Sequence, residues 1–134
     1  MKVEGSCHCG HVAYEADVDP EIVGLCHCTD CQTLSGSPYR VVVPVLASKF
    51  VLRRGQPRIY VKTADSGTQR AQAFCPDCGS PIYAAAPIDP PTYSLRWGAI
   101  KERALFTPKR QIWCGSAVPW ALDLSGIPGV KGQS

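Results

Sequence analysis

The sequence lacks the features that mark several common functional classes. Its formal net charge at pH 7 is only +3 over 134 residues, which is too small to favour nucleic acid or an acidic membrane as a partner. No hydrophobic run approaches the roughly 18 residues that a transmembrane helix needs. Repeats of whole structural units are also missing. We therefore expect a protein with no nucleic-acid partner and no membrane partner.

A secretory signal is missing as well. The start of the chain, Met1 to Gly5, leads directly into a cysteine motif and contains no apolar segment of the kind that precedes a cleavage site. This favours a cytoplasmic protein, whose thiols stay reduced. The eight cysteines would permit a disulfide framework, but a reducing compartment and very short cysteine spacings disfavour it. A thioredoxin-like redox pair is disfavoured because no βαβ pattern surrounds a C-x-x-C motif.

The sequence has little that resembles a long helix. Twelve glycines and twelve prolines break it into short apolar segments, and Val12, Tyr14 and Ala16 alternate as on one face of a strand. The pattern predicts a mainly β fold of many short strands, with one or two helical turns around Thr29 to Ser35. Further strands are expected at residues 39–43, 50–52, 59–61, 70–74 and 93–100.

The length suits one domain over residues 1–134. We expect its core to span about residues 3–122. Residues 123–134 are rich in glycine, proline and serine, a composition typical of a flexible or loosely attached tail.

Seven of the eight cysteines fall into three tight clusters. The most specific is Cys75-Pro76-Asp77-Cys78-Gly79, a zinc-knuckle turn in which a glycine supplies the left-handed backbone that the turn needs. A knuckle provides half of a tetrahedral zinc site. The other clusters are Cys7-His8-Cys9-Gly10 and Cys26-His27-Cys28-Thr29-Asp30-Cys31.

The spacing of Cys7 and Cys9 suggests which cluster completes the knuckle. Residues two apart on an extended chain point to the same face, so these two form a claw of two thiolates. Pairing them with Cys75 and Cys78 gives a closed four-cysteine zinc site that ties the N-terminal hairpin to the middle of the chain.

Cys26, Cys28 and Cys31 then remain as a group of three. Three protein ligands and an open fourth position are the arrangement of a catalytic zinc, so we expect two zinc ions per chain. Alternatively, both zincs are structural and Cys114 or a histidine closes the second site. His8 and His27 are poor candidates because strand alternation turns them away from the neighbouring cysteines. Cys114 follows Trp113 in an apolar stretch and is expected to be a small core residue.

Four motifs in the chain also match the pattern of a known family. They are Gly5-Ser6-Cys7-His8-Cys9-Gly10, Cys26-His27-Cys28-x-x-Cys31-Gln32, Ser35-Gly36-Ser37 and Phe74-Cys75-Pro76-x-Cys78-Gly79. In these motifs the chain resembles the glutathione-dependent formaldehyde-activating enzyme family, also called the GFA or centromere-protein-V type. Gln111-Ile112-Trp113 and Pro119-Trp120 resemble the family's closing segment more weakly.

The resemblance implies the Mss4-like fold, an antiparallel β architecture with zinc knuckles and no long helices. It implies the same two zinc ligand sets and a carbon–sulfur lyase-type activity, in which a thiol such as glutathione adds to formaldehyde or a related small aldehyde. The alternative is a non-catalytic Mss4-like module that binds proteins.

The residues that would assist such chemistry remain open. Asp30, His27, Ser35 or a water could supply a proton, although Asp30 is expected mainly to cap the short helix. Arg40, Arg96 and Lys62 could meet carboxylates of glutathione, although each alone resembles an ordinary surface charge. A pocket lined by Trp97 or Trp113 would favour an enzyme, although core packing is the ordinary role of a tryptophan.

Overall fold

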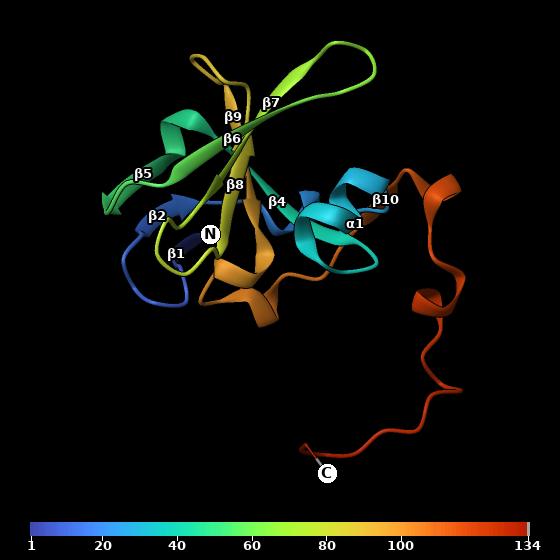
Figure 1. Cartoon of the computed structure of the whole chain (residues 1–134). Helices are drawn as coiled ribbons and strands as arrows, with labels where there is room; N and C mark the ends of the chain where they lie inside the picture. Colours follow the sequence, from blue (N-terminus) through green and yellow to red (C-terminus); the bar gives the residue numbers. More distant parts are fainter. Residues whose placement is uncertain (134) are drawn as a thin grey trace.

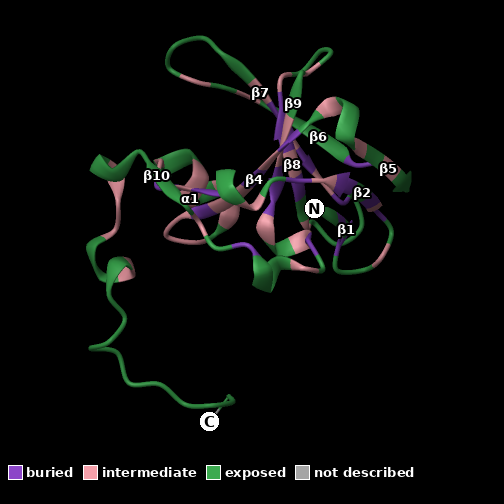
Figure 2. Cartoon of the chain, turned by 180° about the vertical axis from the view of Figure 1, so that it is seen from behind, coloured by how far each residue is buried: buried purple, intermediate pink, exposed green. Residues whose placement is uncertain are grey.

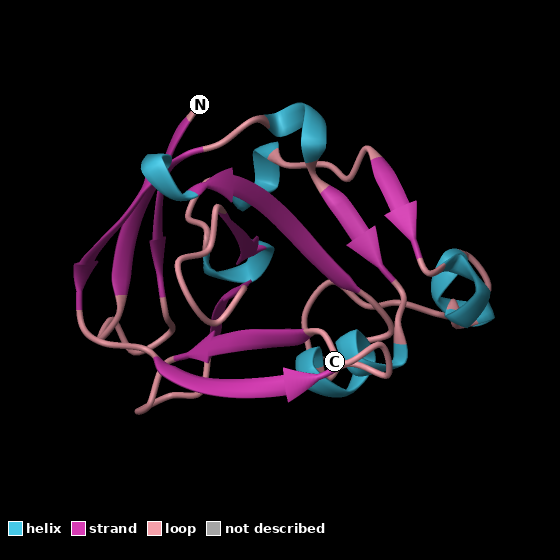
Figure 3. Cartoon of the chain, turned by 90° about the horizontal axis from the view of Figure 1, so that it is seen from above, coloured by secondary structure: helices cyan, strands magenta, loops and turns pink. Residues whose placement is uncertain are grey.

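The described part of the chain is built from short β-strands. The computed structural model describes residues 1–133, and within them the strands far outnumber the single α-helix, while the other helical segments are short 3₁₀ turns (Figure 3). The strands and the helix are β1 (Lys2–Ser6), β2 (Ala13–Asp17), β3 (Gly24–Cys26), α1 (Thr29–Ser35), β4 (Arg40–Leu46), β5 (Phe50–Arg54), β6 (Arg58–Thr63), β7 (Gln69–Phe74), β8 (Pro81–Ala85), β9 (Thr92–Arg96) and β10 (Arg110–Ile112). The prediction of a mainly β fold is confirmed.

The strands form two sheets (Figure 1). A three-stranded sheet has the order β1-β2-β5, and a seven-stranded sheet has the order β10-β3-β4-β9-β8-β7-β6. The pairing is antiparallel with one exception, since β10 runs parallel to β3. The mainly antiparallel architecture that the resemblance implies is therefore confirmed. The exception matters because β10 brings Ile112 to lie beside Cys26.

The core lies between the two sheets. Val12, Tyr14 and Ala16, the alternating residues around β2, are all buried as the pattern predicts, and burial of each large apolar side chain contributes roughly 1.5–3 kcal/mol. From the seven-stranded sheet, Val43, Ile82 and Leu95 are fully buried. Beside them Phe50 stacks on Tyr93 with ring centroids 4.7 Å apart. This core holds the turns that carry the cysteines.

The C-terminal segment lies outside this core. Every residue from 122 to 133 is exposed, and the segment runs away from the sheets (Figures 1 and 2). Among the described residues, no helix has both the length and the apolar character needed to cross a membrane.

Candidate metal centres

Two turns bring four cysteines together. Cys7 and Cys9 follow β1, and the backbone bond from Cys7 N–H to the Val12 carbonyl, 3.0 Å, closes their turn. Cys75 begins a second turn, which the bond from Cys75 N–H to the Ser80 carbonyl closes at 3.0 Å. The sulfurs of the four residues lie within 4.8 Å of one another, and they are Cys7, Cys9, Cys75 and Cys78. These are the residues that the sequence pairs as a closed site.

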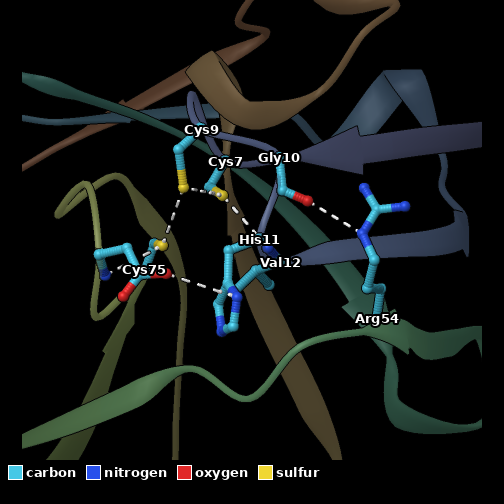
Figure 4. A network of polar contacts seen from close by, with 8 residues as sticks. Cys7, Cys9, Gly10, His11, Val12, Arg54 and Cys75 are labelled. Atoms are coloured by element: carbon cyan, nitrogen blue, oxygen red, sulfur yellow. Dashed lines mark hydrogen bonds and ion pairs between the residues drawn. The ribbon is translucent and has the colours of Figure 1, made fainter.

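The sulfur–sulfur distances in this cluster fit a zinc ion. The Cys9 sulfur lies 3.6 Å from that of Cys7 and 3.7 Å from that of Cys75, and these three residues face one another in Figure 4. In a tetrahedral site with Zn–S bonds of about 2.3 Å, neighbouring sulfurs are about 3.8 Å apart. The side chains thus already have the spacing that zinc requires.

The backbone supports negative charge on these sulfurs. Val12 N–H donates to the Cys7 sulfur at 3.2 Å, and Asp77 N–H donates to the Cys75 sulfur at 3.4 Å. The second bond depends on the tight turn after Cys75, where Gly79 has the left-handed φ of 77° that the knuckle motif predicts. Thiolates are the form in which cysteine binds zinc, so both turns are shaped for metal ligation.

The acid–base chemistry of the cluster also points to a cation. The hydroxyl of Ser80 and the backbone N–H groups of Ser80 and Cys9 lower the pKa of Cys78 to about 5. Although the His11 N–H acts in the opposite direction, desolvation and the neighbouring sulfurs raise the pKa of Cys9 to about 12. Cys78 therefore ionises far more readily than Cys9 when no counter-ion is present. A divalent cation allows all four to be thiolates, and the cluster therefore fits zinc.

The second cluster is local in sequence. Cys26 ends β3, Cys28 is the N-cap of α1 and Cys31 lies in its first turn, with the three sulfurs within 4.8 Å of one another. The helix spans Thr29–Ser35, as the sequence predicts. The expectation that Asp30 caps it is wrong, because the Cys28 sulfur accepts the hydrogen bond from Cys31 N–H at 3.2 Å. The capping acceptor is thus itself a candidate ligand.

The local environment shifts the pKa values of the thiols in this cluster in different directions. Burial, reinforced by the sulfurs of Cys28 and Cys26, raises the pKa of Cys31. Burial also acts to raise the pKa of Cys28, but hydrogen bonds from Cys31 outweigh this effect. Together with the Cys26 thiol and the charge of Lys62, these hydrogen bonds hold the pKa of Cys28 below its ordinary value. Cys28 is therefore the first thiolate of the group, and the three sulfurs suit a soft cation such as zinc.

Within residues 1–133, no further histidine, cysteine or acidic side chain joins this group of three. His8 is exposed. His27 is fully buried, and its Nε2 lies 2.8 Å from the side-chain oxygen of Gln111 in β10. Cys114 is exposed, so the prediction that it is a core residue is wrong. It follows Trp113, whose left-handed backbone turns the chain outward after β10.

The other candidate residues separate into two groups. Asp30 is bound to Lys62 at 2.6 Å, so this lysine is already paired. Arg40 and Arg96 are only 6% and 8% exposed, which corrects the view of each as an ordinary surface charge. No local sequence pattern indicates that these two arginines are buried, although both lie in strands, where alternate residues face inward.

Of the remaining candidates, Ser35 and Trp97 line the same pocket as the two arginines, whereas Trp113 does not. Ser35 has a buried hydroxyl without a hydrogen-bond partner. It lines a pocket together with Arg40, Arg96 and Trp97. Trp113 does not line this pocket and is 66% exposed.

Comparisons with known proteins place this geometry in a family. Residues 2–116 match the family described as glutathione-dependent formaldehyde-activating enzyme. A search of curated proteins finds no match. A solved structure of a Rhodobacter sphaeroides protein, a structural genomics target, is similar in fold, with a TM-score of 0.61 and 19% sequence identity over 81% of this chain and 98% of that one. The chain belongs to the glutathione-dependent formaldehyde-activating enzyme family.

Proposed function

We propose that this protein is a zinc-dependent carbon–sulfur lyase-type enzyme that adds a thiol, glutathione or a relative, to formaldehyde or a similar small aldehyde. The family assignment supports a glutathione-dependent or related zinc-binding function. The observation that carries the proposal is the Cys26, Cys28 and Cys31 cluster, which offers three sulfurs and no fourth protein ligand within residues 1–133. Zinc normally takes four ligands, so this cluster leaves one position for a substrate thiol.

The two cysteine clusters would have different roles, one structural and one catalytic. Cys7, Cys9, Cys75 and Cys78 would hold a zinc that joins two distant turns and serves the fold. Cys26, Cys28 and Cys31 would hold the other, which when bound supplies a position that keeps an added thiol deprotonated and nucleophilic. The open position makes this ion the candidate for catalysis.

The reaction also needs a proton donor. When a thiol adds to an aldehyde, a carbon–sulfur bond forms and the carbonyl electron pair becomes an alkoxide that must take up a proton. Ser35 lies four residues after Cys31 on α1 and therefore shares its helix face. Its buried hydroxyl has no partner and would hydrogen-bond the developing oxyanion, while the proton that the thiol releases on binding would return to the oxyanion through water. His27 binds Gln111 through Nε2 and has a buried Nδ1 without a partner, and Ser35 is preferred because it shares the helix face of Cys31.

The proposal is tested by thiol binding in place of turnover, because the uncatalysed addition is fast enough to obscure a rate. Cobalt(II) replaces zinc, and glutathione is titrated while the thiolate-to-cobalt absorption bands are recorded. The proposal predicts a saturable spectral change in wild type and its loss in Cys28→Ser. A spectrum that no thiol changes would instead support a protein-binding module with two structural metals.

A further inference from the structure

A basic pocket lies beside the four-cysteine cluster and reaches Ser35 of α1. Its volume is about 540 Å³, and its lining includes Cys7 from the four-cysteine cluster and Ser35 from α1, together with Arg40, Arg96, Lys101 and Arg103. No aspartate or glutamate lines it. The pocket therefore presents positive charge without an internal counter-charge.

The two arginines at its base are buried and share a single neutral acceptor. The side-chain oxygen of Gln72 accepts from Arg96 at 2.7 Å and from Arg40 at 3.3 Å. Neither arginine forms an ion pair among residues 1–133. Buried charges in proteins are normally paired, because removing them from water is costly. One amide oxygen shared by two guanidinium groups leaves most of their donors unused.

The charge on Arg96 persists at neutral pH. Burial, followed by the nearby charge of Arg40, lowers the pKa of Arg96 to about 9, which is still well above 7. The sulfurs of Cys31 and Cys26 act in the opposite direction and raise the pKa of Arg96. Arg96 therefore lies within electrostatic range of the three-cysteine cluster.

The rest of the lining leaves the two arginines as the groups at the base that can bind an anion. The Ser35 hydroxyl, buried and without a partner, lies on the helix face of Cys31 and is assigned to the reacting oxygen. At the rim, Lys101 is bound to Glu4 at 2.7 Å and Arg103 lies over the Trp97 ring at 5.8 Å. Donors without a protein partner therefore remain on Arg40 and Arg96.

We propose that Arg40 and Arg96 form a carboxylate-binding subsite that selects an anionic thiol for the three-cysteine cluster. The inference rests on the proposed function, because it assigns the acid end of the ligand whose sulfur binds beside Cys31. A planar guanidinium binds a carboxylate through two parallel hydrogen bonds. Glutathione carries two carboxylates, whereas 2-mercaptoethanol carries none, so the subsite distinguishes these two thiols.

The test uses a ligand that cannot bind through sulfur. The tripeptide γ-glutamyl-2-aminobutyryl-glycine is glutathione with a methyl group in place of the thiol, and its binding to the zinc-loaded protein is measured by calorimetry. We expect at least tenfold weaker binding to Arg96→Gln and to Arg40→Gln. The matched control is Arg53→Gln on β5, an exposed residue paired with Glu15, and it should bind as wild type does.

A further variant keeps both arginines and changes their partner. Gln72→Glu places an internal carboxylate at the shared acceptor, so it should raise the melting temperature and weaken tripeptide binding at least tenfold. This variant addresses the objection that an arginine substitution simply unfolds the protein. No binding to wild type, or equal binding to wild type and to all three pocket variants, would overturn the subsite.

The cobalt titration separates this inference from the proposed function. If glutathione and 2-mercaptoethanol change the spectrum with equal affinity in wild type and in Arg96→Gln, the function stands and the subsite is overturned. If no thiol changes the spectrum but the tripeptide binds in an arginine-dependent manner, the subsite stands as a carboxylate site and the thiol-activating function fails.

Discussion

The two cysteine clusters differ in how much of the chain each one joins. The four-cysteine cluster links turns that are far apart in sequence, with Cys9 and Cys75 separated by 66 residues and their sulfurs in contact. The three-cysteine cluster lies within Cys26 to Cys31 and joins only the end of β3 to the start of α1. A metal in the first cluster closes a long loop, whereas a metal in the second organises a short one. Two clusters of the same ligand type are therefore expected to contribute differently to the free energy of unfolding.

The largest effect is expected from breaking the long-range cluster. Cys75→Ser removes a ligand that is fully buried at the edge of the core. A structural zinc contributes on the order of 10 kcal/mol of apparent binding free energy, which is comparable to the whole stability of a typical domain. We expect the variant to be unfolded or aggregated, as judged by circular dichroism and size-exclusion chromatography. Cys7→Ser should behave in the same way.

An intermediate effect is expected from breaking the local cluster. Cys28→Ser should remain folded, lose mainly one zinc, and melt within about 5 °C of wild type, because little of the core depends on residues 26–31. The matched control is Cys114→Ser, an exposed cysteine outside both clusters, which should keep both metals. Destabilisation of Cys28→Ser as severe as that of Cys75→Ser would show that both metals are structural.

The smallest effects are expected from the two glycines that shape these clusters. Gly79 and Gly36, the C-cap of α1, have left-handed backbones, and an added Cβ meets no atom within 4 Å at either. Alanine should therefore cost about 1–2 kcal/mol through backbone conformation alone.

Because the two clusters join different amounts of the chain, we expect the costs of Gly79→Ala and Gly36→Ala to appear in different measurements. For Gly79→Ala the cost should lower the free energy of unfolding. For Gly36→Ala it should appear as a roughly tenfold weaker affinity of the second metal, with little change in the melting temperature. Gly129→Ala, in the exposed C-terminal segment, should change neither quantity. Equal losses of unfolding free energy in the first two variants would contradict the distinction.

The sequence predicts the local features well, for physical reasons that particular residues show. The alternation of Val12, Tyr14 and Ala16 predicts the buried face around β2 because side chains of a strand point alternately to its two sides. The helix at Thr29–Ser35 follows from the cysteine spacing and from Gly36, whose left-handed backbone ends it. Each of these signals acts within a few residues of the structure that it determines.

Features that depend on distant segments are not predictable in the same way. The parallel pairing of β10 with β3 brings residue 112 beside residue 26, and no local pattern announces it. Arg40 and Arg96 each look like a surface charge, and only the sheet order places both beside Gln72. Cys114 lies in an apolar stretch yet is exposed, because the left-handed backbone of Trp113 turns the chain away from the core.

The difference between a closed and an open metal site is tested most directly by counting sulfur ligands. X-ray absorption at the zinc edge measures the average number of sulfurs per zinc in protein shown to carry two zincs per chain. The account predicts about 3.5 sulfurs per zinc without added thiol, because the seven clustered cysteines would share two ions, rising to about 4 when glutathione is added. An average of 4 sulfurs before any thiol is added, unchanged by glutathione, would contradict it.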